Sequence, residues 1–171
     1  MNTKWKLMVL TAVLVAIGTG VGVSARGWYV PWMSQRMVLE GSDKFVLVSL
    51  HPQAVPEGVK TQGDFYGFAM LGQKQITDPK LKARLVKALY EGLEVPEDYA
   101  AGDCFFPSYG IRATRAGRTV DVALCYDCGG VEFYEGREEE HVPTLREPRA
   151  VFEKAVVAAK LPRAADVGWV E

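Results

Sequence analysis

The sequence predicts an α+β fold: a mostly antiparallel sheet of four to five strands with two helices packed on one face, preceded by an N-terminal transmembrane or signal segment. Short β-branched and apolar runs, bounded by glycine and proline, alternate with two amphipathic segments that carry helix-capping residues. A chain of 171 residues, 49% of them hydrophobic, supplies enough apolar material for one such domain.

Residues 1–25 are predicted to be a transmembrane anchor or a signal peptide. The stretch from Leu7 to Ala25 carries no charge and lies between Lys6 and Arg26. Small residues at its end favour cleavage, whereas tryptophan and tyrosine on its flanks favour an uncleaved anchor. In the first case the protein is secreted or periplasmic, and in the second it is membrane-anchored. Either way we expect the domain to be extracytoplasmic.

Residues 26–43 are predicted to be an irregular juxtamembrane connector, and residues 44–171 a single α+β domain. The formal net charge of −1 provides no surplus of basic residues to neutralise a phosphate backbone, so nucleic acid is not an expected partner. The chain contains no nucleophile elbow, phosphate loop or His-Glu-x-x-His pair. The sequence therefore predicts no catalytic residue and favours a protein that is not an enzyme.

The first half of the domain predicts two strand regions and a helix. Lys44 to Pro52 is a short apolar run stopped by proline, which is typical of a strand buried on both faces. Gly63 to Ile76 predicts a second strand region with a bulge or kink at Gly72. Residues 78–92 begin with Asp-Pro and end with glycine, the signals of a capped helix.

The second half predicts a hairpin and a closing helix. Residues 104–136 give two or three strands around a turn at Arg115 to Arg118. The polar segment 137–143 is interpreted as loop-like, solvated sequence. A helix then begins at Pro148 and is ended by Pro162.

The hairpin turn leaves two registers open. A two-residue loop at Ala116-Gly117 pairs Ile111 with Val122 and places apolar residues together on one face. A three-residue loop with a left-handed glycine pairs Cys104 directly with Cys128, and turn chemistry favours it because alanine is a poor first residue of a type I′ turn. In both registers the three cysteines are expected at one sheet edge.

These cysteines allow three interpretations. An oxidising compartment favours a structural disulfide from Cys104 to Cys128 or Cys125, which leaves an odd thiol. Zinc is the second interpretation, because Cys-x-x-Cys-Gly resembles half of a zinc knuckle and Cys104 could be a third ligand. A closed zinc site needs four ligands, however, and His51 and His141 are expected at a strand end and in a solvated loop. A thiol-disulfide oxidoreductase is the third, although such couples stand at a helix N-terminus, and here a turn and a strand follow the pair.

The candidate binding patch is the sheet edge formed by Cys104, Tyr109, Arg112, Cys125 and Cys128. Tyr109 and Arg112 flank a glycine beside the first cysteine, in the stretch "PSYGIR". A tyrosine and an arginine at this position could bind a small anion or a partner protein. No cofactor is expected unless the cysteines hold zinc.

Three segments carry a resemblance: "FYGFAMLGQKQITDP", "CFFPSYGIR" and "RTVDVALCYDC". Together they resemble a recurrent family of small, uncharacterised bacterial proteins, many with an N-terminal membrane or signal segment, over residues 64–134. In that family a histidine usually stands at the position of Tyr109, and this difference weakens the transfer of a metal site. The resemblance implies no activity. The sequence thus predicts a membrane-associated, extracytoplasmic binding or interaction module with a cysteine-stapled sheet edge, with zinc binding or thiol-disulfide exchange as the alternative.

Overall fold

The computed structural model describes residues 31–53, 55 and 58–167. The predicted anchor or signal peptide at 1–25 lies outside these residues. Within the described part of the chain, no helix combines the length and the apolar character needed to cross a membrane.

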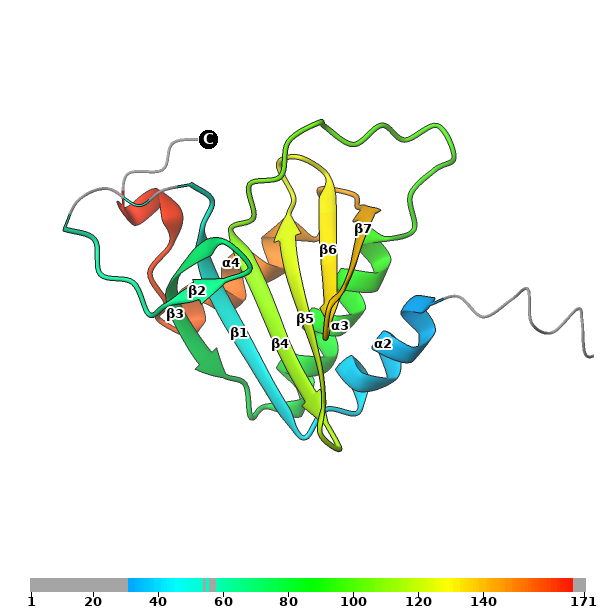
Figure 1. The fold of residues 1–171 in the computed structure, drawn as a ribbon, viewed down its shortest axis with the longest axis horizontal. Coiled ribbons are helices and arrows are strands. Elements are labelled where there is room, and N and C mark those ends of the chain that lie inside the picture. Colours follow the sequence, from blue (N-terminus) through cyan, green and yellow to red (C-terminus); the bar gives the residue numbers. More distant parts are fainter. Residues whose placement is uncertain (1–30, 54, 56–57, 168–171) are drawn as a thin grey trace, which may run out of the picture. The chain divides into compact units, whose positions relative to one another are not determined.

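Seven antiparallel strands form one curled sheet (Figure 1), in the order β2-β3-β1-β4-β5-β6-β7. The prediction of four to five strands was therefore wrong. The strands are β1 (Lys44–His51), β2 (Asp64–Phe65), β3 (Phe68–Gln75), β4 (Tyr109–Arg115), β5 (Arg118–Cys125), β6 (Gly130–Glu135) and β7 (Glu138–Pro143).

The sequence did not predict β2 and β7 as separate strands, for two different reasons. The expected strand region 63–76 is divided by a turn at Tyr66-Gly67, where both residues have positive φ angles of 54° and 89°. Tyrosine is rarely found in the first position of such a turn. The polar segment 137–143, interpreted as a loop, is mostly β7; its glutamates have low strand propensity, but backbone pairing with β6 holds it extended.

Between residues 31 and 167, three α-helices and a short 3₁₀ helix accompany the sheet, so the prediction of two helices was also wrong. They are α2 (Pro31–Glu40), α3 (Pro79–Gly92), α4 (Arg149–Ala158) and η2 (Ala164–Val167). Helix α2 replaces much of the irregular connector expected at 26–43. Helices α3 and α4 lie on one face of the sheet (Figure 1), and Asp78 caps α3 as predicted, accepting the Lys80 N–H at 2.9 Å.

Strand β1 lies in the interior of the sheet, between β3 and β4, and is buried along its length after Lys44, as its apolar run predicted. Its register with β3 shifts between Ser49 and Leu50, opposite Gly72 and Met70, so the expected irregularity at Gly72 is a β-bulge. The β4–β5 hairpin follows the two-residue loop, with Arg115 paired to Arg118.

The sheet face opposite α3 and α4 carries an apolar cluster around β1. Phe65 packs so closely over Gly110 that a Cβ there would lie 3.2 Å from its ring. Phe68 and Phe105 extend this cover from the β2–β3 hairpin and the loop before β4. The buried members of this cluster are Val46, Val48, Leu50, Phe65, Met70, Ala123 and Tyr134.

Candidate functional site

Tyr109 and Arg112, two members of the predicted patch, lie on opposite faces of the sheet. The Tyr109 hydroxyl donates a hydrogen bond of 2.5 Å to Glu153 of α4. Arg112 forms an ion pair with Asp121 on the other face. Side chains alternate between the two faces of a strand, so residues three positions apart cannot share one. The five predicted residues therefore do not form a single surface.

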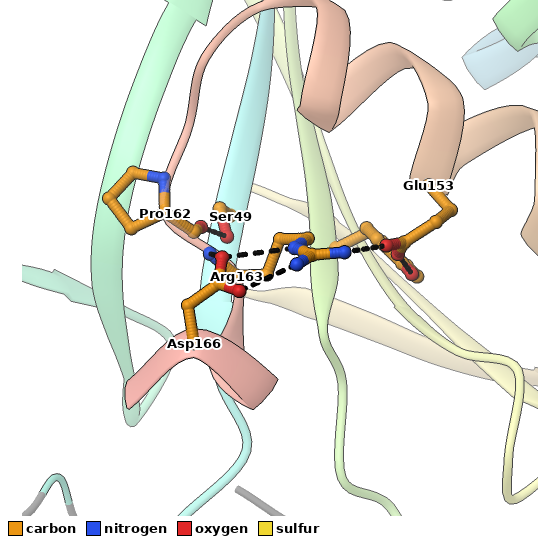
Figure 2. A network of polar contacts seen from close by, with 6 residues as sticks. Ser49, Glu153, Pro162, Arg163 and Asp166 are labelled. Atoms are coloured by element: carbon orange, nitrogen blue, oxygen red, sulfur yellow. Dashed lines mark hydrogen bonds and ion pairs between the residues drawn. The ribbon is translucent and has the colours of Figure 1, made fainter. Parts of the chain in front are cut away.

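The contacts of Tyr109 belong to a polar network on the helix side, shown in part in Figure 2. Glu153 also accepts a hydrogen bond from Arg163 at 2.9 Å, and Arg163 pairs with Asp166 of η2. The Ser49 hydroxyl donates to the carbonyl of Pro162 in the same view (Figure 2). This network fastens the segment after α4 to the sheet, which gives Tyr109 a structural role.

Burial, helped by the hydrogen bond to Glu153, raises the pKa of Tyr109 well above its ordinary value. Burial alone would also raise the pKa of Glu153, but the hydrogen bonds from Tyr109 and Arg163 outweigh it and lower that pKa. The pair therefore stays as a neutral phenol that donates to a carboxylate.

Cys104 and Cys128 form a disulfide, with Cα atoms 5.6 Å apart. The two residues are not partners in the β-ladder, because the regular pairing of β4 with β5 does not extend N-terminally beyond Ser108. Before that point the chain touches the hairpin again at Gly102, whose N–H donates to the carbonyl oxygen of Cys128 at 2.7 Å. The disulfide thus joins the irregular segment between α3 and β4 to the β5–β6 turn.

Cys125 is the remaining thiol, and it is fully buried at the end of β5. Its sulfur accepts hydrogen bonds from the N–H groups of Phe106 and Cys128, at 3.3 and 3.2 Å. Burial raises the pKa of this thiol despite those bonds. The stretch Cys125–Gly130 is a turn between two strands, as its glycines predicted, so no helix dipole activates the thiol.

The two histidines lie in different surroundings, His51 on β1 and His141 on β7. His51 lies at a strand end as expected, at the end of β1, but it is buried, and its Nδ1 lies 2.9 Å from the carbonyl oxygen of Gln53. His141 lies on β7, 3.4 Å from Glu132. Within the described residues, no group of three or more histidine, cysteine or acidic side chains is arranged to hold a metal ion.

Arg112 instead takes part in a cluster on the face opposite the helices. It donates to both carboxylate oxygens of Asp121 at 2.8 to 3.1 Å. The Tyr66 hydroxyl donates to the same carboxylate at 3.0 Å, and the guanidinium lies 5.3 Å from the centre of the Phe65 ring. Asp121 is only 2% exposed. These contacts balance its negative charge and hold its side chain in place.

The ring of Tyr66 extends this cluster toward β6 and β7. It stacks on Tyr134 with ring centres 3.7 Å apart, and its residue is still 42% exposed. The Tyr134 hydroxyl donates to Glu132, which also faces His141 across the β6–β7 pair. We call these six residues the tyrosine platform: Tyr66, Arg112, Asp121, Glu132, Tyr134 and His141.

Sequence reasoning identified only Arg112 of this platform. One signal for Asp121 was available, because the two-residue hairpin register places it opposite Arg112. The role of Tyr66 had no such signal, since its contacts depend on the turn that brings the β2–β3 hairpin over the sheet. Tyr66 adopts a left-handed backbone that asparagine or glycine adopts more easily, and such strain is found most often at binding and active sites.

A hollow beside α3 has a volume of about 430 Å³. Its lining includes Arg36, Glu40, Lys87 and Glu91, and these form two ion pairs among themselves. These four charges are thus already matched within the chain.

A scan against protein-family models and searches of curated proteins and of solved structures found no match to this chain.

Proposed function

We propose that this chain is an extracytoplasmic binding module, and that its partner docks on the tyrosine platform. The observation that carries the proposal is the state of Tyr66. Its backbone is held at a φ of 54°, its hydroxyl is fixed by the buried Asp121, and its residue remains 42% exposed. A rigid aromatic ring that offers a large accessible area is the kind of anchor that dominates binding surfaces.

The strain at Tyr66 supports a role in binding rather than in folding alone. Asparagine or glycine at this position would form the same turn at lower conformational cost. Tyrosine brings a ring and a hydroxyl group that reach Tyr134 and Asp121. The contacts immobilise the ring before any partner arrives, and this lowers the entropy cost of binding.

The disulfide supports the extracytoplasmic location. Such bonds persist in oxidising compartments and are rare in the reducing cytosol. The uncharged run at 7–25 is consistent with export, and its retention or cleavage stays a prediction.

Site-specific photo-cross-linking tests the proposal. A benzophenone amino acid replaces Tyr66 or, as a control, Val157, which is 53% exposed on α4. We expect a discrete cross-linked product in intact cells from position 66 and none from position 157. A second substitution, Tyr134→Leu, removes the ring on which residue 66 stacks and should abolish the product. Equal yields from both positions, or a product that is indifferent to Tyr134→Leu, would contradict the proposal.

A further inference from the structure

Strand β7 offers an open edge beside the tyrosine platform. It is the last strand of the sheet and pairs with β6 alone. Throughout the described residues, Glu138–Pro143 makes no backbone hydrogen bond to any other element. The strand has six residues in continuous register, whereas β2 at the opposite edge has only two. An edge of this length presents a row of backbone donors and acceptors to which another strand can add.

The charge of this edge is unmatched. Glu138, Glu139 and Glu140 are successive carboxylates, and none has an ion-pair partner in the described part of the chain. Two carboxylates elsewhere in the sheet region are matched: Glu135 binds Arg118 at 2.7 Å and Asp127 binds Arg149 at 2.5 Å. The β7 carboxylates therefore repel one another, and cations supplied by a partner would relieve that repulsion.

The register places these charges on both sides of an added strand. Glu139 lies opposite Tyr134 and so faces the tyrosine platform. Glu138 and Glu140 lie opposite Glu135 and Phe133 and face the other side. A strand paired with β7 thus meets carboxylates on both of its faces. On the platform side, a long cationic side chain also comes near the exposed Tyr66 ring, where cation–π attraction adds to the charge pairing.

We propose that β7 binds a basic, extended segment of a partner protein, which adds to the sheet as an eighth strand. This inference rests on the proposed binding function and names the class of its partner. A second copy of this chain does not suit the edge, because β7 carries no lysine or arginine. Antiparallel pairing of β7 with β7 in full register would set the glutamates opposite Pro143, Val142 and His141 and would bring the carboxylates of both copies together. Carboxylates disfavour nucleic acid for the same reason.

Two labelled peptides test the inference on the full-length chain purified under non-reducing conditions. The basic probe is Lys-Val-Lys-Thr-Lys-Val-Lys-Thr, and the acidic probe carries glutamate in place of each lysine. We expect fluorescence anisotropy to show binding of the basic probe only. Its affinity should fall as salt rises from about 0.01 M to about 0.15 M, because the Debye length shrinks from about 30 Å to about 8 Å.

Charge reversal supplies the decisive variant. The triple substitution E138K/E139K/E140K should weaken the basic probe more than about tenfold and allow the acidic probe to bind. A protein that had merely lost its fold would bind neither probe. The control, E91K/E94K/E97K, changes the net charge equally at and after the end of α3, and it should bind like the unmodified chain.

A third probe separates strand addition from simple charge attraction. The basic peptide N-methylated at alternate residues keeps its charge but loses the donors needed for pairing. We expect it not to bind, and we expect the unmethylated probe to slow hydrogen exchange within 138–143. Equal binding of the methylated peptide, or binding without that protection, would overturn the inference. If neither peptide binds while position 66 still cross-links in cells, the β7 inference fails alone; loss of that cross-link identifies a failure of the proposed function.

Discussion

Arg112 holds the buried carboxylate of Asp121 from the adjacent strand, and its Nη2 lies 2.8 Å from Oδ2. The Asp121 side chain is 3% exposed and that of Arg112 is 40% exposed, so the pair spans the boundary between the sheet and solvent. A carboxylate in such a place is tolerated only while its charge is compensated. This pair therefore determines whether the tyrosine platform keeps its shape.

The substitution Arg112→Ala should lower the free energy of unfolding by about 3 kcal/mol, the low end for a broken buried ion pair, since Arg112 is half-exposed. It leaves Tyr66 as the only side-chain partner of Asp121 among the hydrogen bonds described here. Urea denaturation of the full-length chain measures the loss. The control is Arg118→Ala, which removes a more exposed pair with Glu135 and should cost less than about 1 kcal/mol. Equal losses in the two variants would contradict this account.

Two buried tyrosines should respond in opposite ways to loss of their hydroxyl groups. Tyr109→Phe removes a hydrogen bond to Glu153 and should destabilise the protein by about 1–2 kcal/mol. The Tyr126 hydroxyl is buried without a hydrogen-bond partner in the described structure. Tyr126→Phe removes that unsatisfied group and should be neutral or stabilise by about 1 kcal/mol. Urea midpoints of the two variants test the contrast, and a larger loss for Tyr126→Phe would disprove it.

Stability should fall at alkaline pH. Burial raises the pKa values of Tyr109, Tyr126 and Tyr134 in the folded state above the unfolded value of about 10. Below that value these tyrosines are protonated in both states, and their contribution is fully present. As pH rises further, the unfolded state releases protons that the folded state retains, so stability is progressively lost.

Urea midpoints between about pH 8 and about pH 11 measure this effect. The Tyr126→Phe variant lacks one of the shifted groups, so its midpoint should fall less steeply than that of the unmodified chain. A midpoint that stays constant across this range would show that the tyrosines titrate alike in both states.

Cys125 should be unreactive as long as the oxidised protein stays folded. The N–H groups that contact its sulfur belong to Phe106 and Cys128, and the disulfide holds the segment that contains Phe106. A maleimide reagent should modify no thiol of the native, oxidised protein, one thiol after denaturation, and three after reduction and denaturation. The Cys125→Ala variant should show none and two in the last two conditions.

The same samples test the zinc and redox alternatives. Three free thiols with one equivalent of zinc in protein from an oxidising compartment would replace the disulfide account. A disulfide that cycles with a reductant at physiological potential would support exchange chemistry instead.

The elements that the sequence predicted well are those whose signals are local. The helix at 78–92 has its cap and its terminal glycine in the sequence, and the bulge at Gly72 was expected from a glycine within a strand. Strand β7 was not predicted, because its extended conformation comes from pairing with β6 and its glutamates have low strand propensity. Propensity reports the local preference, which long-range pairing overrides.

The site was predicted less well than the fold. The predicted binding patch consisted of residues that are close together in the hairpin sequence. Side chains alternate between the faces of a strand, however, so Tyr109 points toward α4 and Arg112 points away from it. Tyr66, whose ring carries the proposed binding role, is 55 positions from Asp121 in the chain. Contacts across such a separation follow from the folded hairpin and leave no periodic trace in one sequence.

The β4–β5 hairpin also determines which disulfide is correct. Three cysteines allow three different pairings, and all three lie within the stretch from Cys104 to Cys128. Once the strands pair, Cys125 is enclosed at the end of β5, while Cys104 is left beside Cys128. In the folded hairpin the competing thiol is thus out of reach of the other two cysteines. An oxidase acting on this protein needs no proofreading partner, provided that it acts after the hairpin has formed.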